Sequence, residues 1–301
     1  MTTTVAVIGP GAIGCVVAGA LAQRQALGAA SLVVCARHAF ERIVLSGSTG
    51  EHDLVVRVVT DPGQLRGPVD VVVLATKTYQ TPGAAPWLDA TCAPGSIVLV
   101  CQNGIEQRDL VEPLVAGATV VPAVVQLPAD RSAPGVVHVG GRARLVVADS
   151  DAGRRCAELF DGSLLDVAAR ADFAEQAWRK LMMNAAVGAV TVLTRRSLDV
   201  LDDPDAAAIA ARIMEEVAEV ARAEGVDIPA GLGTSMVASA VGTARGHTSS
   251  IAVDRLAGRP TEWRARNEVV VRLADRHGLE VPVSRLLTPL LRLGEPRPDE
   301  G

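Results

Sequence analysis

The sequence predicts an α/β domain that is followed by an all-α domain. Short valine-rich runs alternate with alanine-rich helical segments through the first half of the chain, as in α/β folds. After residue 172 the strand-like runs stop, and prolines and glycines mark the starts and ends of successive helices. The length of 301 residues is enough for two domains of about 100–200 residues each. We therefore expect one domain over residues 1–172 and a second over residues 173–301.

Continuous apolar runs in the first half predict parallel strands that are covered on both faces of a sheet. The clearest run spans residues 69–76, and similar runs occupy residues 4–8, 31–36, 54–59 and 96–101. Three shorter runs beyond Ala118 are separated by Pro and Gly, and they predict an antiparallel edge to the same sheet. These runs are residues 120–127, 136–139 and 144–147.

Helical periodicity dominates the second half. One long helix is predicted over residues 173–196. The pair Asp203-Pro204 supplies an N-cap and a first-turn proline for the next helix, which ends before Gly225. That helix is expected to present an apolar face of Ile209, Ile213, Val217 and Val220. Further helices are predicted over residues 12–26 and 232–245, from Pro260 to Gly278, and after Pro282.

Charge and composition exclude several classes of function. A net charge of −5 and few aromatic residues argue against nucleic-acid binding. No apolar stretch reaches the roughly 20 residues that span a bilayer, and no basic segment precedes the first strand, so we expect a cytoplasmic protein without a membrane partner.

The five cysteines lack CxxC spacing and are expected to be buried and reduced. The five histidines show no metal-ligand spacing, so no metal is predicted.

A glycine-rich loop directly follows the first predicted strand and opens the first helix. Its residues are Gly9-Pro10-Gly11-Ala12-Ile13-Gly14, which fit the pattern G-x-G-x-x-G. The first glycine makes the tight turn, the second lets the backbone approach a pyrophosphate, and the third lets the helix pack close to the strand. The N-terminus of the helix favours bound phosphate. The loop in this context predicts a Rossmann domain that binds a dinucleotide.

The end of the second predicted strand indicates which dinucleotide is bound. An NAD-binding domain usually has Asp or Glu there, which binds the ribose 2′-hydroxyl. This strand instead ends in Cys35-Ala36-Arg37-His38, with no carboxylate. A guanidinium at this position can bind a 2′-phosphate through two hydrogen bonds. Arg37 therefore predicts NADP(H), the alternative being that Arg37 is an ordinary surface cation.

Two more polar residues follow predicted strands of the same sheet. Lys77 follows the fourth strand, and Asn103 follows the fifth. Ligands of open α/β sheets bind at the carboxyl ends of the strands, so both residues are candidates for contact with the cofactor. A solvated lysine and an Asn-Gly turn would explain the same residues without a ligand.

The helical half contains candidates for acid–base chemistry. Lys180 and Asn184 are four residues apart and therefore share one helical face. Glu262 follows Pro260 and is expected in the first turn of a helix. An ammonium beside a ketone stabilises the negative charge that hydride addition creates on oxygen, and it can supply the proton.

Local pairing would explain the same charges without catalysis. Lys180 could form an ion pair with Glu175 or Asp172. Glu262 could be stabilised by the helix dipole, or it could pair with Arg266 at the i+4 position.

Five motifs occur in order along nearly the whole chain and carry a family resemblance. They are GPGAIG at residues 9–14, ATK at 75–77, QNG at 102–104, WRKLMMN at 178–184 and SSIAVDRLAGRPTE at 249–262. With this set of motifs the chain resembles the ketopantoate reductase (2-dehydropantoate 2-reductase) family.

The resemblance implies NADPH-dependent reduction of a 2-oxo acid to a 2-hydroxy acid. The substrate it implies is 2-dehydropantoate (ketopantoate), which is converted to pantoate in pantothenate biosynthesis. It implies that Lys180 is the catalytic lysine, which protonates the ketone oxygen, and that Glu262 contacts the hydroxyl group of the substrate. The positions it implies for substrate binding are Asn184, Ser250 and Asn103, and Lys77 and Asn103 line the junction of cofactor and substrate.

The chain departs from the family pattern near these residues. Gly188 stands where the family usually has a second asparagine, and the usual Glu-Ile-Asp followed by Asn-Gly reads Glu262-Trp263-Arg264 followed by Asn267-Glu268. These changes predict a preference for a larger or differently charged 2-oxo acid. Two alternatives stay open, namely a related reductase of another 2-oxo acid or an imine, and a nonenzymatic NADP-binding sensor. The apolar helical half could also support a homodimer.

Overall fold

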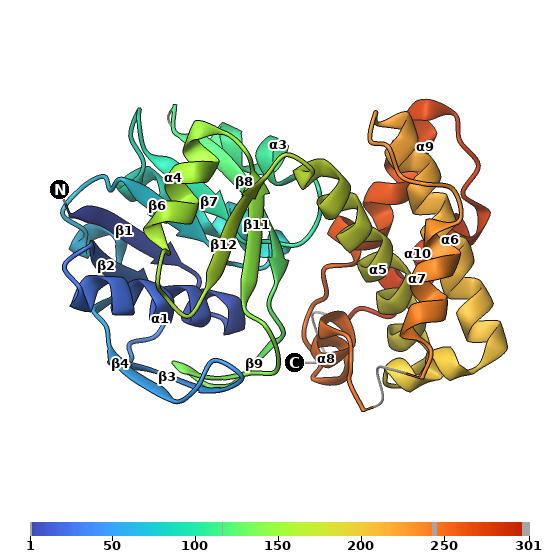
Figure 1. Cartoon of the computed structure of the whole chain (residues 1–301), viewed down its shortest axis with the longest axis horizontal. Helices are drawn as coiled ribbons and strands as arrows, with labels where there is room; N and C mark the ends of the chain where they lie inside the picture. The colour runs from blue at the N-terminus through green and yellow to red at the C-terminus, as the bar shows by residue number, and fades with distance from the viewer. Residues whose placement is uncertain (1, 116, 243–245, 297–301) are drawn as a thin grey trace. The chain divides into compact units, whose positions relative to one another are not determined.

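The computed structural model describes residues 2–115, 117–242 and 246–296 (Figure 1). The chain divides into two compact units, Met1–Phe173 and Ala174–Gly301. The division lies one residue beyond the boundary expected from the sequence.

The first unit is built on an eight-stranded sheet with the strand order β12-β11-β8-β7-β6-β1-β2-β5. The strands from β5 to β8 in this order are all parallel, and β11 is antiparallel to β8. This order places β1 between β2 and β6, where the direction of winding reverses, as in a Rossmann fold. The strands are β1 (Thr3–Ile8), β2 (Ala30–Cys35), β5 (Val58–Val59), β6 (Val71–Leu74), β7 (Ile97–Val100), β8 (Thr119–Gln126), β11 (Arg144–Ala148) and β12 (Asp166–Arg170).

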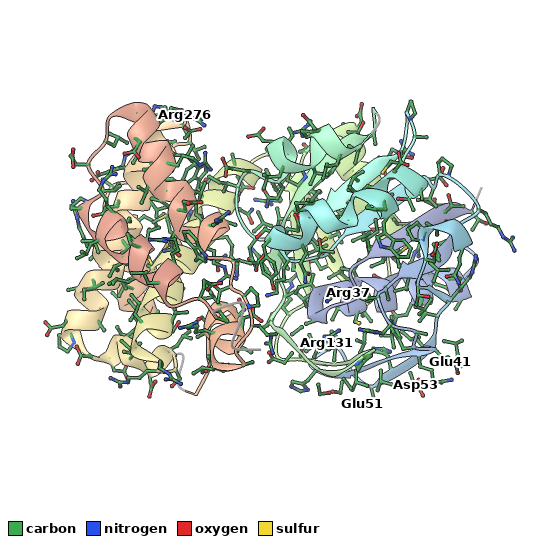
Figure 2. All side chains as sticks on the ribbon, turned by 180° about the vertical axis from the view of Figure 1, so that it is seen from behind. Arg37, Glu41, Glu51, Asp53, Arg131 and Arg276 are labelled. Carbon is green, nitrogen blue, oxygen red and sulfur yellow. The ribbon has the colours of Figure 1, made fainter. Side chains whose placement is uncertain are left out.

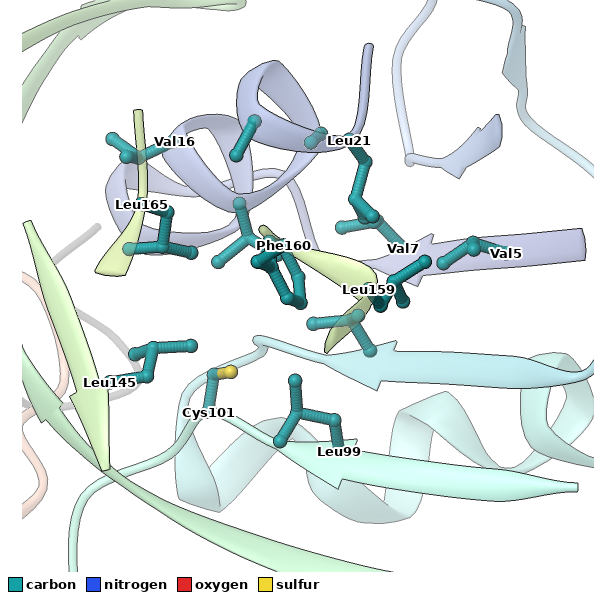
Figure 3. Close-up of a cluster of buried hydrophobic side chains, with 14 of the residues drawn as sticks. Val5, Val7, Val16, Leu21, Leu99, Cys101, Leu145, Leu159, Phe160 and Leu165 are labelled. Atoms are coloured by element: carbon teal, nitrogen blue, oxygen red, sulfur yellow. The ribbon is translucent and has the colours of Figure 1, made fainter. Parts of the chain in front are cut away.

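Alternate side chains of the central strands enter two separate cores. Val5 and Val7 of β1 belong to one buried cluster, and Ala6 and Ile8 belong to the other, as the two-residue period of a strand requires. Figure 3 shows part of the first cluster, which includes Val5 and Val7 of β1 and the buried Phe160. Both faces of the sheet are therefore covered, which explains the continuous apolar runs. The helices of this unit are α1 (Ala12–Ala26), α2 (Ala85–Thr91), α3 (Gln107–Val111) and α4 (Asp151–Leu159).

A second sheet of four strands, in the order β4-β3-β10-β9, was not expected. The run at residues 54–59 was predicted as one strand, but it is divided between the two sheets. The reason is that the Val56 amide donates to the Glu41 carbonyl, while the Arg57 carbonyl accepts from Val34 of β2. The predicted strand at residues 136–139 pairs with β3 and β9, so its assignment to the edge of the main sheet was wrong. The four strands are β3 (Arg42–Gly47), β4 (His52–Val55), β9 (Ala129–Ala133) and β10 (Val136–Val139).

The cysteines lie inside this first unit. All five are buried and have free thiols. Burial raises the pKa of Cys15 to about 11 and that of Cys35 to about 12. These thiols therefore stay protonated near neutral pH and are poor nucleophiles.

Helices make up the regular structure in the described part of the second unit. The helix expected over residues 232–245 ends at Ala240, and residues 243–245 lie outside the described part of the chain. The α-helices are α5 (Phe173–Thr194), α6 (Pro204–Ala223), α7 (Leu232–Ala240), α8 (Ser250–Leu256), α9 (Val269–His277) and α10 (Pro282–Leu293), with one π-helical segment at Arg264–Glu268.

The start of α6 follows the sequence signal, but its apolar face is shorter than expected. The Asp203 side chain accepts hydrogen bonds from the amides of Asp205 and Ala206, as an N-cap does. Ile213 of the expected apolar face is buried, whereas Ile209 is 43% exposed, so the face is not buried over its whole length. Ala210 is the first buried residue of α6, so this end of the helix lies largely outside the core.

A buried carboxylate of α6 replaces the missing cap of α10. Val281 precedes Pro282 and has no side-chain oxygen to cap the helix. Glu216 of α6 accepts from the Val283 amide at 3.0 Å and from the Ser284 amide at 2.8 Å. These bonds satisfy two amides at the start of α10 and fix that helix against α6.

Candidate active site

The glycine loop between β1 and α1 has the geometry of a phosphate-binding turn. Gly9 has φ +88°, and a Cβ there would lie 2.6 Å from Thr76 Cγ2. A Cβ on Gly14 would lie 2.2 Å from the Gly9 carbonyl oxygen. A Cβ on Gly11 would meet nothing within 4 Å, so the space above the loop is open. No side chain caps the N-terminus of α1, and its first turn contains no acidic residue. These features fit the pyrophosphate of a dinucleotide.

Two arginines of the first unit are placed near this loop by the backbone. The Gly9 amide donates to the Cys35 carbonyl at 3.2 Å, so the end of β2, with the exposed Arg37, is next to the loop. Arg131 of β9 donates from Nη1 to the Pro10 carbonyl at 3.5 Å. Figure 2 labels both arginines. Sequence reasoning missed Arg131 because β9 carried no strand signal, and its pairing with β10 is what brings this side chain to the loop.

Buried glutamines hold the loops that carry Lys77 and Asn103. Gln102 donates from Nε2 to the Thr76 carbonyl at 3.0 Å and to the Thr76 hydroxyl at 2.9 Å. Gln107 donates to the carbonyls of Gln102 and Gly104. The loops after β6 and β7 are therefore fixed to each other at the carboxyl edge of the sheet. The sequence predicted that ligands bind at this edge of the sheet, but it did not predict that Gln102 and Gln107 join the two loops.

Lys180 lies half-buried on α5, as Asn184 does one turn later. Burial, and then the nearby Arg266 guanidinium, lower the pKa of Lys180 below its usual value of 10.5. A lysine with a lowered pKa is a better proton donor near neutral pH. The geometry thus supports an acid–base group at Lys180, in addition to a helical face shared with Asn184.

Glu262 does not lie in the first turn of a helix, so this part of the sequence prediction was wrong. The helical segment begins at Trp263, and residues 259–262 before it have no regular secondary structure. Glu295, beyond α10, accepts from the Thr261 amide at 2.9 Å and from the Thr261 hydroxyl at 2.6 Å. This carboxylate holds the backbone at Thr261, next to Glu262, which is buried and directly precedes the helical segment.

Arg266 brings the remaining site residues of the helical unit together. Its Nη2 lies 3.6 Å from Glu262 Oε2 and donates to Ser250 Oγ at 3.0 Å. A Cβ on Gly188 would lie 3.9 Å from Arg266 Nη1. From the sequence we expected Arg266 only as an i+4 partner of Glu262. Local spacing does not reveal that both side chains are buried.

The other departures from the family pattern fall in different surroundings. Trp263 is buried, and the exposed Arg264 lies over its ring at 5.3 Å. Asn267 is buried and donates to the Ala185 carbonyl at 2.9 Å, which joins the π-helical segment to α5. Among these departures, Gly188 is the one that lies beside Arg266.

Across residues 2–115, 117–242 and 246–296, no group of three or more His, Cys, Asp or Glu side chains is arranged to hold a metal ion. No helix in those ranges is long and apolar enough to cross a membrane.

A Rossmann unit with a phosphate loop, followed by a helical unit with a half-buried lysine, defines a class of two-unit dinucleotide-dependent proteins. Comparison with family models identifies the member of this class. Residues 5–152 match the model described as "Ketopantoate reductase PanE/ApbA", and residues 172–295 match its C-terminal counterpart. The chain belongs to the ketopantoate reductase family.

Curated relatives match over nearly their whole length. A 2-dehydropantoate 2-reductase of Mycobacterium tuberculosis is 38% identical, with 97% of each chain covered. One of Caulobacter vibrioides is 36% identical, with 96% of this chain and 98% of the relative covered. Among solved structures, a PanE/ApbA family ketopantoate reductase from Ralstonia eutropha is 29% identical with a TM-score of 0.87, and 97% of this chain and 98% of that chain are covered.

Two further solved structures share this fold. A dimeric ketopantoate reductase from Staphylococcus aureus is 25% identical with a TM-score of 0.86, and 99% of this chain and 100% of that chain are covered. A D-mandelate dehydrogenase described with NADH has a TM-score of 0.85 at 19% identity, over 97% of each chain. At this identity the likeness concerns the fold alone.

Proposed function

We propose that this protein is an NADPH-dependent oxidoreductase that reduces a 2-oxo acid to a 2-hydroxy acid. Ketopantoate is the proposed substrate and pantoate the product, for use in pantothenate biosynthesis. The observation that carries the proposal is the half-buried Lys180, whose pKa is lowered, within the group that contains Glu262, Ser250 and Arg266. Full-length similarity to proteins named 2-dehydropantoate 2-reductase supports the same reaction.

Each proposed catalytic or substrate-binding residue has a role that its chemistry explains. The Lys180 ammonium donates a proton to the carbonyl oxygen of the substrate and stabilises the negative charge that develops there. Glu262 accepts a hydrogen bond from the substrate hydroxyl group. The side chains that bind the remaining polar groups of the substrate are Asn184, Ser250 and Asn103.

The cofactor site is proposed in the first unit. The loop from Gly9 to Gly14 binds the pyrophosphate through backbone amides, and Arg37 binds the 2′-phosphate. Lys77 lies at the carboxyl end of β6, where the cofactor passes over the sheet edge. NADPH supplies the hydride when it is bound.

A spectrophotometric screen of 2-oxo acids tests this function directly. We expect ketopantoate to drive oxidation of NADPH, with NADH as the matched control cofactor giving a much lower kcat/KM. A higher kcat/KM for another 2-oxo acid would make the protein a related reductase. Absence of turnover with every carbonyl or imine substrate would contradict an enzyme and favour an NADP-binding sensor.

Replacement of Arg37 by alanine is expected to raise the KM for NADPH about 10-fold or more and to leave the KM for NADH nearly unchanged. The reason is that a charged hydrogen bond to the 2′-phosphate is worth about 1.5–3 kcal/mol and NADH has no such phosphate. Steady-state kinetics with both cofactors measure the effect. An unchanged KM for NADPH would show that Arg37 is only a surface cation.

We also propose that the protein forms a homodimer, by analogy with the Staphylococcus aureus enzyme that is described as dimeric. Analytical ultracentrifugation at micromolar concentration measures the mass, and a mass equal to that of one 31.2-kDa chain would contradict the dimer.

A further inference from the structure

Arg266 is a buried charge that the proposed reaction does not use. Its side chain is 2% exposed, although a guanidinium stays protonated at every physiological pH. A buried charge is costly unless it is paired and fully hydrogen-bonded. Arg266 Nη2 lies 3.6 Å from Glu262 Oε2, which gives it one ion-pair partner. Among the described residues, Arg266 Nε has no hydrogen-bond partner.

The charges around Arg266 leave a positive excess. Lys180 and Arg266 are both cations, and the Arg266 guanidinium, after burial, lowers the pKa of Lys180. Glu262 supplies one negative charge. Asp254 also faces Arg266, but it forms an ion pair with Arg259, with Oδ1 at 2.9 Å from Nη2. An additional anion would therefore balance this region.

The Arg266 guanidinium lies close to α5 at Gly188. Lys180, Asn184 and Gly188 occupy the same face on three successive turns of the helix. A Cβ on Gly188 would lie 3.1 Å from Ile251 Cγ2 and 3.9 Å from Arg266 Nη1. Because glycine has no side chain, nothing from this position separates the guanidinium from the face that carries the proposed catalytic lysine.

We propose that Arg266 binds the carboxylate of the 2-oxo acid and thereby determines the specificity of this enzyme for an anionic substrate. The inference rests on the proposed function, because it concerns the same site. Arg266 Nη1 would lie 3.9 Å from a Cβ on Gly188, and the flat fork of its guanidinium matches a carboxylate better than the amide of an asparagine does. Besides their proposed contacts with the substrate, Glu262 and Ser250 hold the Nη2 side of the guanidinium.

The test compares a carboxylate with its neutral counterpart. The two probes are 3,3-dimethyl-2-oxobutanoate and 3,3-dimethyl-2-oxobutanamide, and each is measured as a competitive inhibitor of ketopantoate reduction by the full-length protein. In the unchanged protein we expect the amide to have a Ki on the order of 10²-fold higher than the acid, because the amide leaves a buried charge unpaired. In Arg266→Met the ratio should fall to within about 3-fold, and the KM for ketopantoate should rise on the order of 10²-fold, with a smaller change in kcat.

Two further variants keep the test decisive. Arg264→Met removes a neighbouring but exposed arginine of the same π-helical segment and should leave the Ki ratio unchanged. Arg266→Lys retains the buried charge and should keep part of the preference for the acid, so it replaces Arg266→Met if that variant does not fold. NADPH titration and thermal unfolding verify folding of each variant.

The outcomes separate this inference from the proposed function. If the unchanged protein does not oxidise NADPH with ketopantoate, the proposed function fails. If the unchanged protein does reduce ketopantoate, two results would give Arg266 only a structural role. One is that Arg266→Met retains the 10²-fold preference for the acid, and the other is that Arg264→Met loses this preference to the same extent.

Discussion

Replacement of Lys180 by alanine is expected to lower kcat about 10³-fold or more and to leave the Kd for NADPH within about 2-fold. Loss of the ammonium removes both the proton donor and the positive charge beside the developing oxyanion, and each effect contributes at least about 10²-fold. Cofactor affinity should persist because the proposed NADPH site is built from the first unit. Stopped-flow NADPH oxidation measures the first quantity, and fluorescence titration of NADPH measures the second.

Arg179→Ala is the matched control for this variant. Arg179 precedes Lys180 on α5, is partly exposed, and pairs with Glu175 at 2.6 Å. Its loss should change kcat by less than about 2-fold, since a surface ion pair contributes little. A Lys180→Ala enzyme with near-normal kcat would refute the proton-donor role and would leave Lys180 with a structural role only.

The pH dependence of kcat tests the same role. A general acid must be protonated, so kcat should fall as the pH rises through the pKa of Lys180, and this fall should occur below the usual lysine value of 10.5. Arg266 is one cause of the lowered pKa, so Arg266→Met should move the fall to higher pH. An unchanged profile in that variant would show that the titration belongs to another group.

Replacement of Gly14 by alanine is expected to weaken NADPH binding on the order of 10²-fold and to lower the free energy of unfolding by about 1–3 kcal/mol. The added Cβ would lie 2.2 Å from the Gly9 carbonyl oxygen and 3.3 Å from Ala75 Cβ. The helix must therefore move away from the loop, and its amides lose their alignment with the pyrophosphate. Fluorescence titration and urea unfolding measure the two effects.

Gly11→Ala separates the effect on NADPH binding from the effect on the free energy of unfolding. Its Cβ would meet no protein atom within 4 Å and would enter the space above the loop. This variant should therefore keep the stability of the unchanged protein but bind NADPH more weakly. Normal NADPH affinity in Gly11→Ala would mean that the pyrophosphate does not approach the loop at this residue.

Local sequence signals were sufficient where a single segment determines the structure. The strand–loop–helix at β1 and α1 follows from an apolar run, glycines at fixed spacing and a helical pattern, and the helix has the predicted bounds Ala12–Ala26. The cap at Asp203 is also local, because the side chain binds amides two and three residues further on. The shared face of Lys180 and Asn184 follows from the geometry of one helix.

Prediction failed where the partner of a segment lies far away in the sequence. Residues 54–59 have the pattern of one strand, yet Val56 and Arg57 bond to different sheets. Glu262 lies outside its expected helix because Glu295, which is 34 residues away from Thr261, holds the preceding backbone. Secondary-structure propensity depends on the residue and its near neighbours in sequence, so it contains no information about such distant partners.

The sequence by itself determined the order of the two units, the dinucleotide loop and the residues that resemble a reductase site. Only the tertiary structure decided that Arg266 is buried beside Ser250 and Gly188, because an i+4 pair has the same spacing whether water or protein surrounds it. Burial turns that pair from a surface contact into a charge that must be balanced, and it is packing of the π-helical segment, α8 and α5 that buries it.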